Sequence, residues 1–178
     1  RRFNVDLDPE NEVIVTLGSK EGLANLAQAI TSPGDIILSP NPSYPIHPYG
    51  FIIAGASLRH LPAMNEGIFN PELYLERLEN SIKDSVPAPV ALIVSFPSNP
   101  TAQVVSLEFY KELVKIAIKY NVYILSDLAY AEIYYDNVKP PSILEVSRAK
   151  EVAVEFTSMS KTYAMAGWRI GFAVGNIK

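Results

Sequence analysis

The sequence predicts an α/β protein whose sheet is built from strand-helix-strand units. Short apolar runs alternate along the chain with longer segments of helical period, which is the pattern of such units. The 178 residues are 48% hydrophobic and 19% charged, so the chain can bury a substantial core. Neither an internal repeat nor a low-complexity tract interrupts it, and we therefore expect one domain spanning residues 1–178.

Three strands are predicted in the first part of the chain, at residues 13–16, 36–38 and 57–61. Gly18 and Ser19 open a helix after the first strand, and Pro33-Gly34 ends it. One face of this helix carries apolar residues at helical spacing, namely Leu23, Leu26, Ala27 and Ile30. The proline-rich loop at 40–48 is a candidate binding loop, and a further helix is expected from about Tyr49.

Four more strands are predicted in the second part, at residues 90–95, 122–125, 152–156 and 168–174. A helix is expected at 72–82, followed by a proline-rich connection at 84–89. Ser106 can cap another helix, whose core-facing residues are Tyr110, Leu113, Val114 and Ala117. Together with the first three, these make seven strands.

Composition excludes several classes of function. The net charge is −4 and the lysines and arginines are scattered, so no basic surface for nucleic acid is expected. No run approaches the roughly 20 apolar residues of a membrane-spanning helix, and no membrane partner is expected. The chain has no cysteine and two histidines, which argues against disulfides and metal sites and is compatible with a cytoplasmic protein.

Two groups of polar residues suggest chemistry on an anionic carbonyl compound. Ser158, Lys161 and Arg169 combine a reactive amine with hydroxyl and guanidinium donors, as expected of a phosphate site beside a lysine that binds a carbonyl group. Asp127 and Tyr130 come just after one predicted strand. Asn99 lies just after another, in Phe-Pro-Ser-Asn-Pro-Thr.

These residues resemble the class I/II (fold-type I) aminotransferases of the aspartate aminotransferase superfamily, which use pyridoxal 5'-phosphate (PLP). The segments VTLGSKEG (15–22), PNPSYP (40–45) and MAGWRIGF (165–172) place the resemblance in the branch of alanine (glutamate-pyruvate) and diaminopimelate-type aminotransferases. It implies the three-layer αβα large, PLP-binding domain, with a seven-stranded, mostly parallel sheet and one antiparallel strand. It further implies that an N-terminal segment and a C-terminal small domain are missing, so the chain alone is expected to be inactive.

The resemblance also implies a role for each site residue. Lys161 holds PLP covalently and transfers a proton, and Asp127 pairs with the pyridine nitrogen. Tyr130 and Asn99 contact the cofactor's 3'-oxygen. Tyr44 stacks on the pyridine ring. The phosphate is bound by a set of donors at the other end, namely the backbone amides of Ser19 and Lys20 and the side chains of Ser158 and Arg169.

The resulting hypothesis is an aminotransferase that exchanges an amino group between an amino acid and a 2-oxo acid, with alanine and glutamate as the first expected pair. An aspartate or diaminopimelate aminotransferase, a C-S lyase or another PLP lyase, a cyclopropane-forming synthase and a non-catalytic PLP sensor domain stay open as alternatives. The family implies a homodimer. His47, Tyr49 and His60 are expected to have structural or surface roles, and the position of Glu155 is left undecided.

Overall fold

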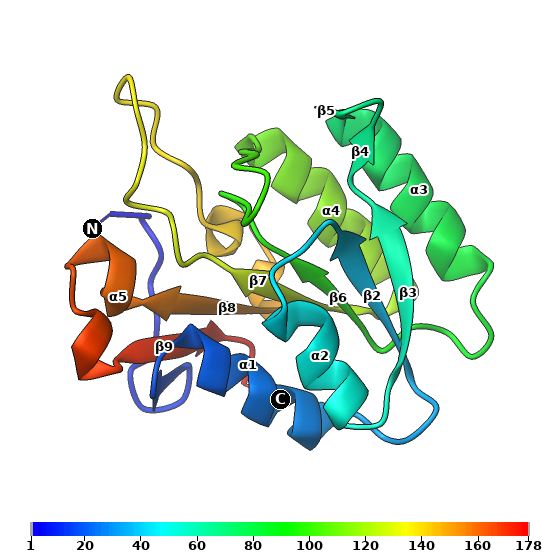
Figure 1. Cartoon of the computed structure of the whole chain (residues 1–178), viewed down its shortest axis with the longest axis horizontal. Coiled ribbons are helices and arrows are strands. Elements are labelled where there is room, and N and C mark those ends of the chain that lie inside the picture. Colours follow the sequence, from blue (N-terminus) through cyan, green and yellow to red (C-terminus); the bar gives the residue numbers. More distant parts are fainter. Residues whose placement is uncertain (1, 178) are drawn as a thin grey trace.

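The computed structural model describes residues 2–177 and has three layers, with one sheet between two layers of helices (Figure 1). The seven strands lie in the order β1 (Val13–Thr16), β9 (Gly171–Gly175), β8 (Ala153–Ser158), β7 (Tyr123–Asp127), β6 (Ala91–Val94), β2 (Ile36–Asn41) and β3 (Ser57–Pro62). β9 is antiparallel to both of its neighbours, and the other neighbouring pairs are parallel. The predicted fold, with seven strands of which one is antiparallel, is therefore confirmed.

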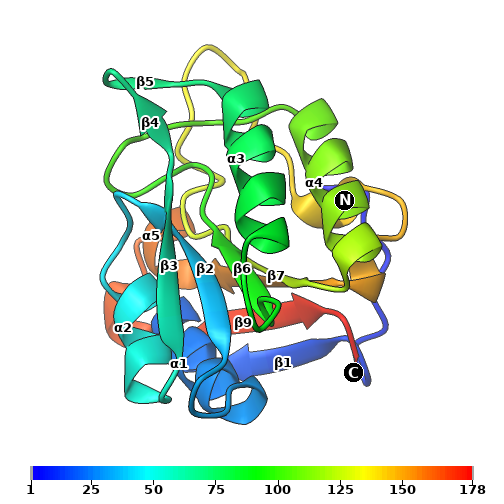
Figure 2. The ribbon, with the colours of Figure 1, turned by 90° about the vertical axis from the view of Figure 1, so that its right-hand side faces the viewer.

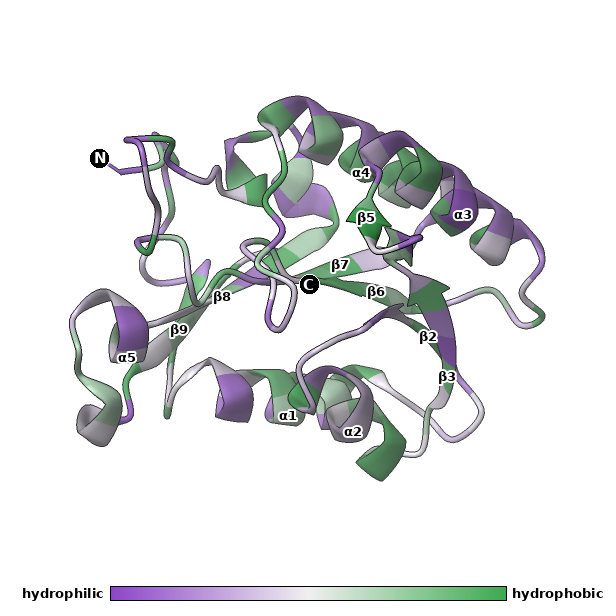
Figure 3. Ribbon diagram, turned by 45° about the horizontal axis from the view of Figure 1, so that its top comes forward, coloured by the Kyte–Doolittle hydropathy of each residue, from purple (hydrophilic) through white to green (hydrophobic). Residues whose placement is uncertain are grey.

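Helices cover both faces of this sheet, as Figures 2 and 3 show. One layer is formed by α1 (Ser19–Ile30) and α2 (Ile46–Ile53), and the other by α3 (Pro71–Lys83) and α4 (Leu107–Tyr120). The remaining helical turns are α5 (Met159–Thr162), η1 (Ile143–Glu145), η2 (Ala149–Glu151) and η3 (Ala166–Trp168). Among residues 2–177 no helix has the length and apolar character needed to cross a membrane.

Two hydrophobic cores lie on the two faces of the sheet. On β2, Ile37 packs with α1 and α2, whereas its neighbour Leu38 packs with α3 and α4; both are fully buried. Because successive side chains of a strand point to opposite faces, a strand covered on both sides must be apolar throughout. This explains the continuous apolar runs from which the central strands were predicted.

Local signals set the helix boundaries on the α3-α4 side. Asn70 caps α3 by accepting a hydrogen bond from the Leu73 amide at 2.9 Å, and Pro71 occupies the first turn, where no amide hydrogen is needed. Ser106 caps α4 by accepting from the Phe109 amide at 3.2 Å, which confirms the predicted cap. Asn121 ends α4 in the left-handed conformation with φ of 54°.

Several elements differ from the prediction. β2 extends to Asn41, three residues beyond its predicted end. α2 begins at Ile46, before Tyr49, because Pro48 lies in the first turn and needs no hydrogen bond there. The last strand begins at Gly171 rather than at residue 168, since η3 and a left-handed Arg169 precede it. A small hairpin of β4 (Met64–Asn65) and β5 (Ile68–Phe69) was not predicted. Its two-residue turn is Glu66-Gly67, both with positive φ, which suits a tight hairpin.

Candidate active site

The nine predicted site residues lie at one edge of the sheet. The parallel strands β1, β2, β6, β7 and β8 all end at this edge, and each is followed by at least one of these residues. β9 runs in the opposite direction, so its first residues, which follow Arg169, lie at the same edge. Ligands of open α/β sheets bind outside the carboxyl ends of the strands, so this edge is the expected position of a site.

Asp127 is a largely buried carboxylate paired with a histidine. It ends β7 and is 7% exposed, and its Oδ2 lies 3.0 Å from Nε2 of His47. His47 is completely buried in the first turn of α2. Oδ1 of Asp127 is also buried and has no hydrogen-bond partner within residues 2–177. The pair fixes the orientation of the carboxylate and leaves one oxygen for another donor.

The sequence analysis expected a structural or surface role for His47, and the structure shows it buried, with a contact to Asp127 that was not predicted. It lies three residues after Tyr44 in the loop predicted to bind, and the two rings meet edge to face with centroids 6.0 Å apart. The available signal was that His47 follows Tyr44 closely at the start of a helix, but the helix was expected to begin only near Tyr49. Tyr49 and His60 are exposed, in agreement with their expected surface roles.

Asn99, Tyr130 and Lys161 come together although they follow three different strands. The Asn99 amide donates to the Tyr130 hydroxyl at 3.3 Å. The Lys161 amine lies 6.0 Å from the centre of the Tyr130 ring. Lys161 is exposed on the short helix α5, so its amine is accessible to a small molecule. A phenol, an amide and an amine thus face the same region.

The Arg169 guanidinium joins two loops of the site. It donates to the Ser160 hydroxyl at 3.1 Å and to the carbonyl oxygens of Ala166 and Leu17, each at 3.2 Å. These bonds use three of the five N-H donors of an arginine. Ser158 caps α5, and its hydroxyl accepts from the Ser160 amide at 3.2 Å.

Gly18 makes room for this guanidinium. It precedes α1 with φ of 87°, and a Cβ atom there would lie 2.3 Å from Nη2 of Arg169. Ser19 begins α1 directly afterwards, so the unpaired amides of the helix start beside Arg169. The Lys20 side chain is exposed, and its amine lies 5.3 Å from the centre of the Tyr44 ring. Ser19, Ser158 and Arg169 form a set of donors suited to a phosphate.

These groups fit PLP in three respects. The buried Oδ1 of Asp127 can accept a hydrogen bond from a protonated pyridine nitrogen. The donor set around Gly18 suits a dianion. Lys161 supplies a primary amine on the same edge as both. PLP needs a carboxylate for its ring nitrogen, donors for its phosphate and an amine for its aldehyde. Residues of all three kinds lie at this edge of the sheet.

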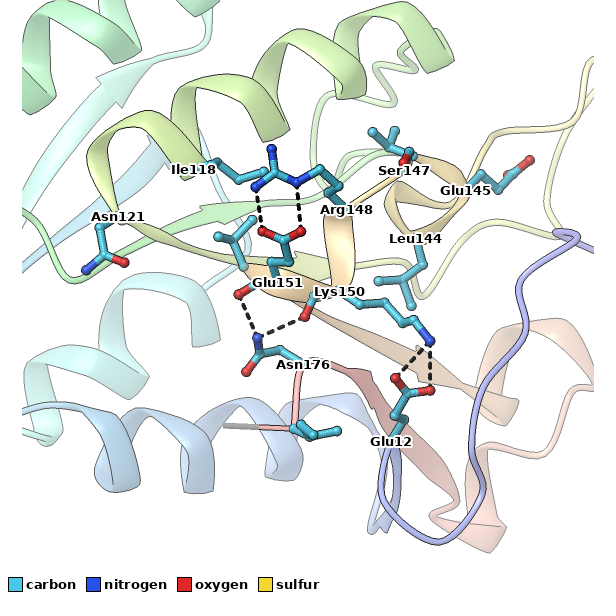
Figure 4. Close-up of a pocket in the computed structure, with 13 residues that line it drawn as sticks. Glu12, Ile118, Asn121, Leu144, Glu145, Ser147, Arg148, Lys150, Glu151 and Asn176 are labelled. Atoms are coloured by element: carbon cyan, nitrogen blue, oxygen red, sulfur yellow. Dashed lines mark hydrogen bonds and ion pairs between the residues drawn. The ribbon is translucent and has the colours of Figure 1, made fainter.

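Two hollows border the edge. One of about 550 Å³ has Asn99 and Tyr130 in its wall, and the other, of about 530 Å³, has Ser158 in its wall. A larger hollow of about 790 Å³ lies at the opposite edge of the sheet, beside the start of β8 and the end of β9 (Figure 4).

The charged groups of this larger hollow are already engaged with one another. Arg148 and Glu151 form a two-point ion pair, with contacts of 2.7 and 2.8 Å. Lys150 pairs with Glu12, and Asn176 donates to two backbone carbonyls. Figure 4 shows these contacts among the residues that line the hollow. Arg148 is therefore paired within its own turn, and Lys150 joins η2 to the segment around Glu12, so neither cation is left for a ligand.

Comparison with known proteins agrees with this geometry. A family model described as "Aminotransferase class I and II" matches residues 1–177. The chain is 54% identical over 175 residues to the glutamate-pyruvate aminotransferase AlaC of Escherichia coli (strain K12), covering 98% of the chain and 41% of that protein. It is 51% identical over 181 residues to an LL-diaminopimelate aminotransferase of Aquifex aeolicus (strain VF5), covering 99% of the chain and 44% of that protein.

A solved structure is similar as well. The substrate-bound BacF structure from Bacillus subtilis superimposes with a TM-score of 0.85 at 37% identity, over 99% of the chain and 44% of that structure. The chain thus spans a little over two fifths of the length of these relatives.

Proposed function

The chain belongs to the class I and II aminotransferase family, and from this premise we propose that it binds PLP and transfers an amino group from an amino acid to a 2-oxo acid. Alanine and glutamate, with their 2-oxo acids, are the first expected pair, since AlaC carries the name of that reaction. A diaminopimelate substrate is the second candidate, since a relative at 51% identity is named for it.

The observation that carries this proposal is the convergence of six side chains at one edge of the sheet. A buried carboxylate-histidine pair, a hydrogen-bonded phenol and amide, an accessible lysine and a fixed guanidinium meet there; they are Asp127, His47, Tyr130, Asn99, Lys161 and Arg169. A buried carboxylate oxygen without a hydrogen-bond partner is costly, so Oδ1 of Asp127 is suited to a donor from a ligand.

Each group has a distinct task in the proposal. PLP, when bound, supplies the aldehyde that takes up the amino group and the ring that accepts electrons. The Asp127 carboxylate, oriented by His47, would accept a hydrogen bond from the ring nitrogen and so favour its protonated form. The Lys161 amine would hold the cofactor and would move the proton of the substrate's α-carbon.

The other side chains orient the cofactor. Tyr130 and Asn99, which are already bonded to each other, contact the ring oxygen. The Tyr44 ring, which is in contact with His47, would pack against the cofactor ring. The phosphate is bound by donors of three segments, namely the Ser19 and Lys20 amides, the Ser158 hydroxyl and the Arg169 guanidinium.

We further propose that the protein acts as a homodimer in the cytoplasm, with amino acids and 2-oxo acids as its partners. Family membership supports the dimer and the substrates. The net charge of −4 argues against nucleic acid as a partner. Sedimentation of the PLP-loaded protein tests the dimer.

The cofactor assignment is tested by the visible absorbance of the protein with added PLP. Wild type and Lys161→Ala are compared, followed by borohydride reduction and mass analysis of the modified peptide. Lys115→Ala serves as the control, since Lys115 is an exposed lysine on α4, remote from this edge. We expect PLP to be trapped on Lys161 in the wild type and the control only. Trapping that is undiminished in Lys161→Ala would contradict the assignment.

The reaction is tested by supplying alanine and 2-oxoglutarate to the PLP-loaded protein. Glutamate formation supports amino transfer, and the same assay with diaminopimelate distinguishes the second candidate. Release of ammonia or of a side-chain thiol would indicate a lyase instead. Trapped PLP with no turnover of any substrate would support the cofactor assignment without separating an aminotransferase from a sensor domain, since the chain alone is expected to be inactive.

A further inference from the structure

Glu155 is a buried carboxylate that the proposed chemistry does not use. It lies in the middle of β8, is 2% exposed and stands beside Ser126 of the neighbouring strand β7. Among residues 2–177 no lysine or arginine pairs with it, so its charge is met by hydrogen bonds alone. A carboxylate in such a place is costly and calls for a reason.

Its hydrogen bonds come from two distant points of the chain. The Ser126 hydroxyl donates to Oε2 at 3.1 Å. The Ser142 hydroxyl donates to Oε1, and the Ile143 amide donates to Oε2 at 3.1 Å. We refer to Glu155, Ser126, Ser142 and Ile143 as the Glu155 cluster. One carboxylate thereby binds both ends of the segment formed by residues 127–141.

This segment begins with two site residues. Asp127 is its first residue and Tyr130 follows one turn later. Arg2 also holds it, through an ion pair with Glu132 and a hydrogen bond to the carbonyl of Pro140, whereas its tip has no such anchor among the contacts of residues 2–177. Positions 135–139 are all exposed, and the segment forms no helix or strand beyond Asp127. In Figure 1 it is the long loop that rises away from the sheet after β7. A loop of this kind is mobile unless its ends are fixed.

We propose that Glu155 is a positioning residue for the candidate site. By binding the two ends of the 127–141 segment, its carboxylate fixes the direction in which the chain leaves β7. That direction determines where the Tyr130 hydroxyl meets the cofactor ring, whereas Asp127 is held by its pairing in the sheet and by His47. The inference rests on the proposed PLP site and adds to it a residue that contacts neither cofactor nor substrate.

The groups around Glu155 make its charge state relevant near neutral pH. Burial raises its pKa to about 7, although the bonds from Ser142, Ile143 and Ser126 lower it. Glu145 of η1 raises it slightly further, and Tyr110 of α4 faces it from the other side with a pKa that is itself raised, mainly by burial. When Glu155 is protonated, one of its oxygens becomes a donor. The group that donated to that oxygen must then change its hydrogen bond.

The test compares amide hydrogen exchange in the wild type, Glu155→Ala, Glu155→Gln and Ser142→Ala, without PLP. Reporters are the amides of Leu128 and Ile133, which bond to the carbonyls of Phe156 and Tyr130. We expect their exchange to be about tenfold faster in the Ala variants and intermediate in Glu155→Gln, which keeps one accepting oxygen. Ser147→Ala, in an exposed neighbouring turn, should match the wild type.

The exchange pattern separates positioning from a general loss of stability. Amides of α4, such as that of Ala117, should keep their wild-type rates in every variant. Equal acceleration there, or no acceleration in the 127–141 segment, would overturn the inference. If Glu155→Ala does not fold, Glu155→Gln and Ser142→Ala still decide between these outcomes.

A second readout links the segment to the cofactor. We expect the Ala variants to bind PLP about tenfold more weakly and to shift the pH midpoint of the bound chromophore, since Tyr130 contacts the ring oxygen. Unchanged affinity and midpoint beside faster exchange would show that Glu155 holds the loop without positioning the site, and would overturn the inference. Failure of the wild type to bind PLP would instead overturn the proposed function. The exchange experiment is done without PLP, so it still shows whether Glu155 holds the 127–141 segment.

Discussion

Replacing Gly171 by alanine tests how closely β9 approaches the candidate phosphate loop. A Cβ atom at Gly171 would lie 2.7 Å from the carbonyl oxygen of Thr157, and 2.8 and 2.9 Å from the carbonyl carbon and Cα of Gly18. All three are backbone atoms, so no side-chain rotation can relieve the contact. Inserting a methyl group into a packed interior costs about 1–3 kcal/mol, and a clash with backbone favours the upper end.

The expected result for Gly171→Ala is a melting temperature lowered by about 2–4 °C for each kcal/mol lost, as measured by far-ultraviolet circular dichroism. Gly167→Ala is the matched control, because Gly167 has no atom within 4 Å of its added Cβ and does not have positive φ. We expect the control to lie within about 0.5 kcal/mol of the wild type. Equal stability of the two variants would refute the inferred contact between β9 and the Gly18 loop.

Three further substitutions have defined outcomes. Ser106→Ala removes the cap of α4 and should lower the free energy of unfolding by about 1 kcal/mol in urea titration, whereas exposed Ser147→Ala should not. Phe156→Ala empties a fully buried position and should cost about 3–5 kcal/mol; a loss below 1 kcal/mol would contradict its place in the core. Because the pKa of Glu155 is raised from 4.5 to about 7 on folding, the folded state binds the extra proton, and stability should fall as pH rises between these values, by at most about 1.4 kcal/mol per unit. Glu155→Gln should remove this slope, and an unchanged slope would show that another group causes it.

The fold was largely accessible from the sequence because its signals are local. The apolar runs of the central strands follow from burial on both faces, and Ser106 and the residues after Gly18 mark helix starts by their own chemistry. The hairpin at Met64–Phe69 escaped because each of its strands has two residues, too few to show a period. The start of α2 escaped because a proline in a first turn resembles a loop proline.

The residues of the candidate site could be predicted only from motifs of several residues taken together. The family resemblance carried by the motifs pointed to Lys161 and Asp127, but no local rule gives the contact of His47 with Asp127, 80 residues apart in the chain. The same holds for Glu155, whose partners lie 29, 13 and 12 residues away. Such contacts depend on which strands become neighbours, and strand order is a property of the whole sheet.

The one antiparallel strand of the seven-stranded sheet, β9, shows how strand order brings the residues of the candidate site together. β9 lies between β1 and β8, and both of these end at the site edge. A parallel strand in this position would begin at the opposite edge and would carry Arg169, which precedes it, to the far side of the sheet. Because β9 runs backward, its start lies beside the ends of its neighbours, and the Arg169 guanidinium reaches both the Leu17 carbonyl after β1 and the Ser160 hydroxyl after β8. The direction of one strand thus brings a cation to the helix starts that follow β1 and β8, which is the arrangement an anionic ligand requires.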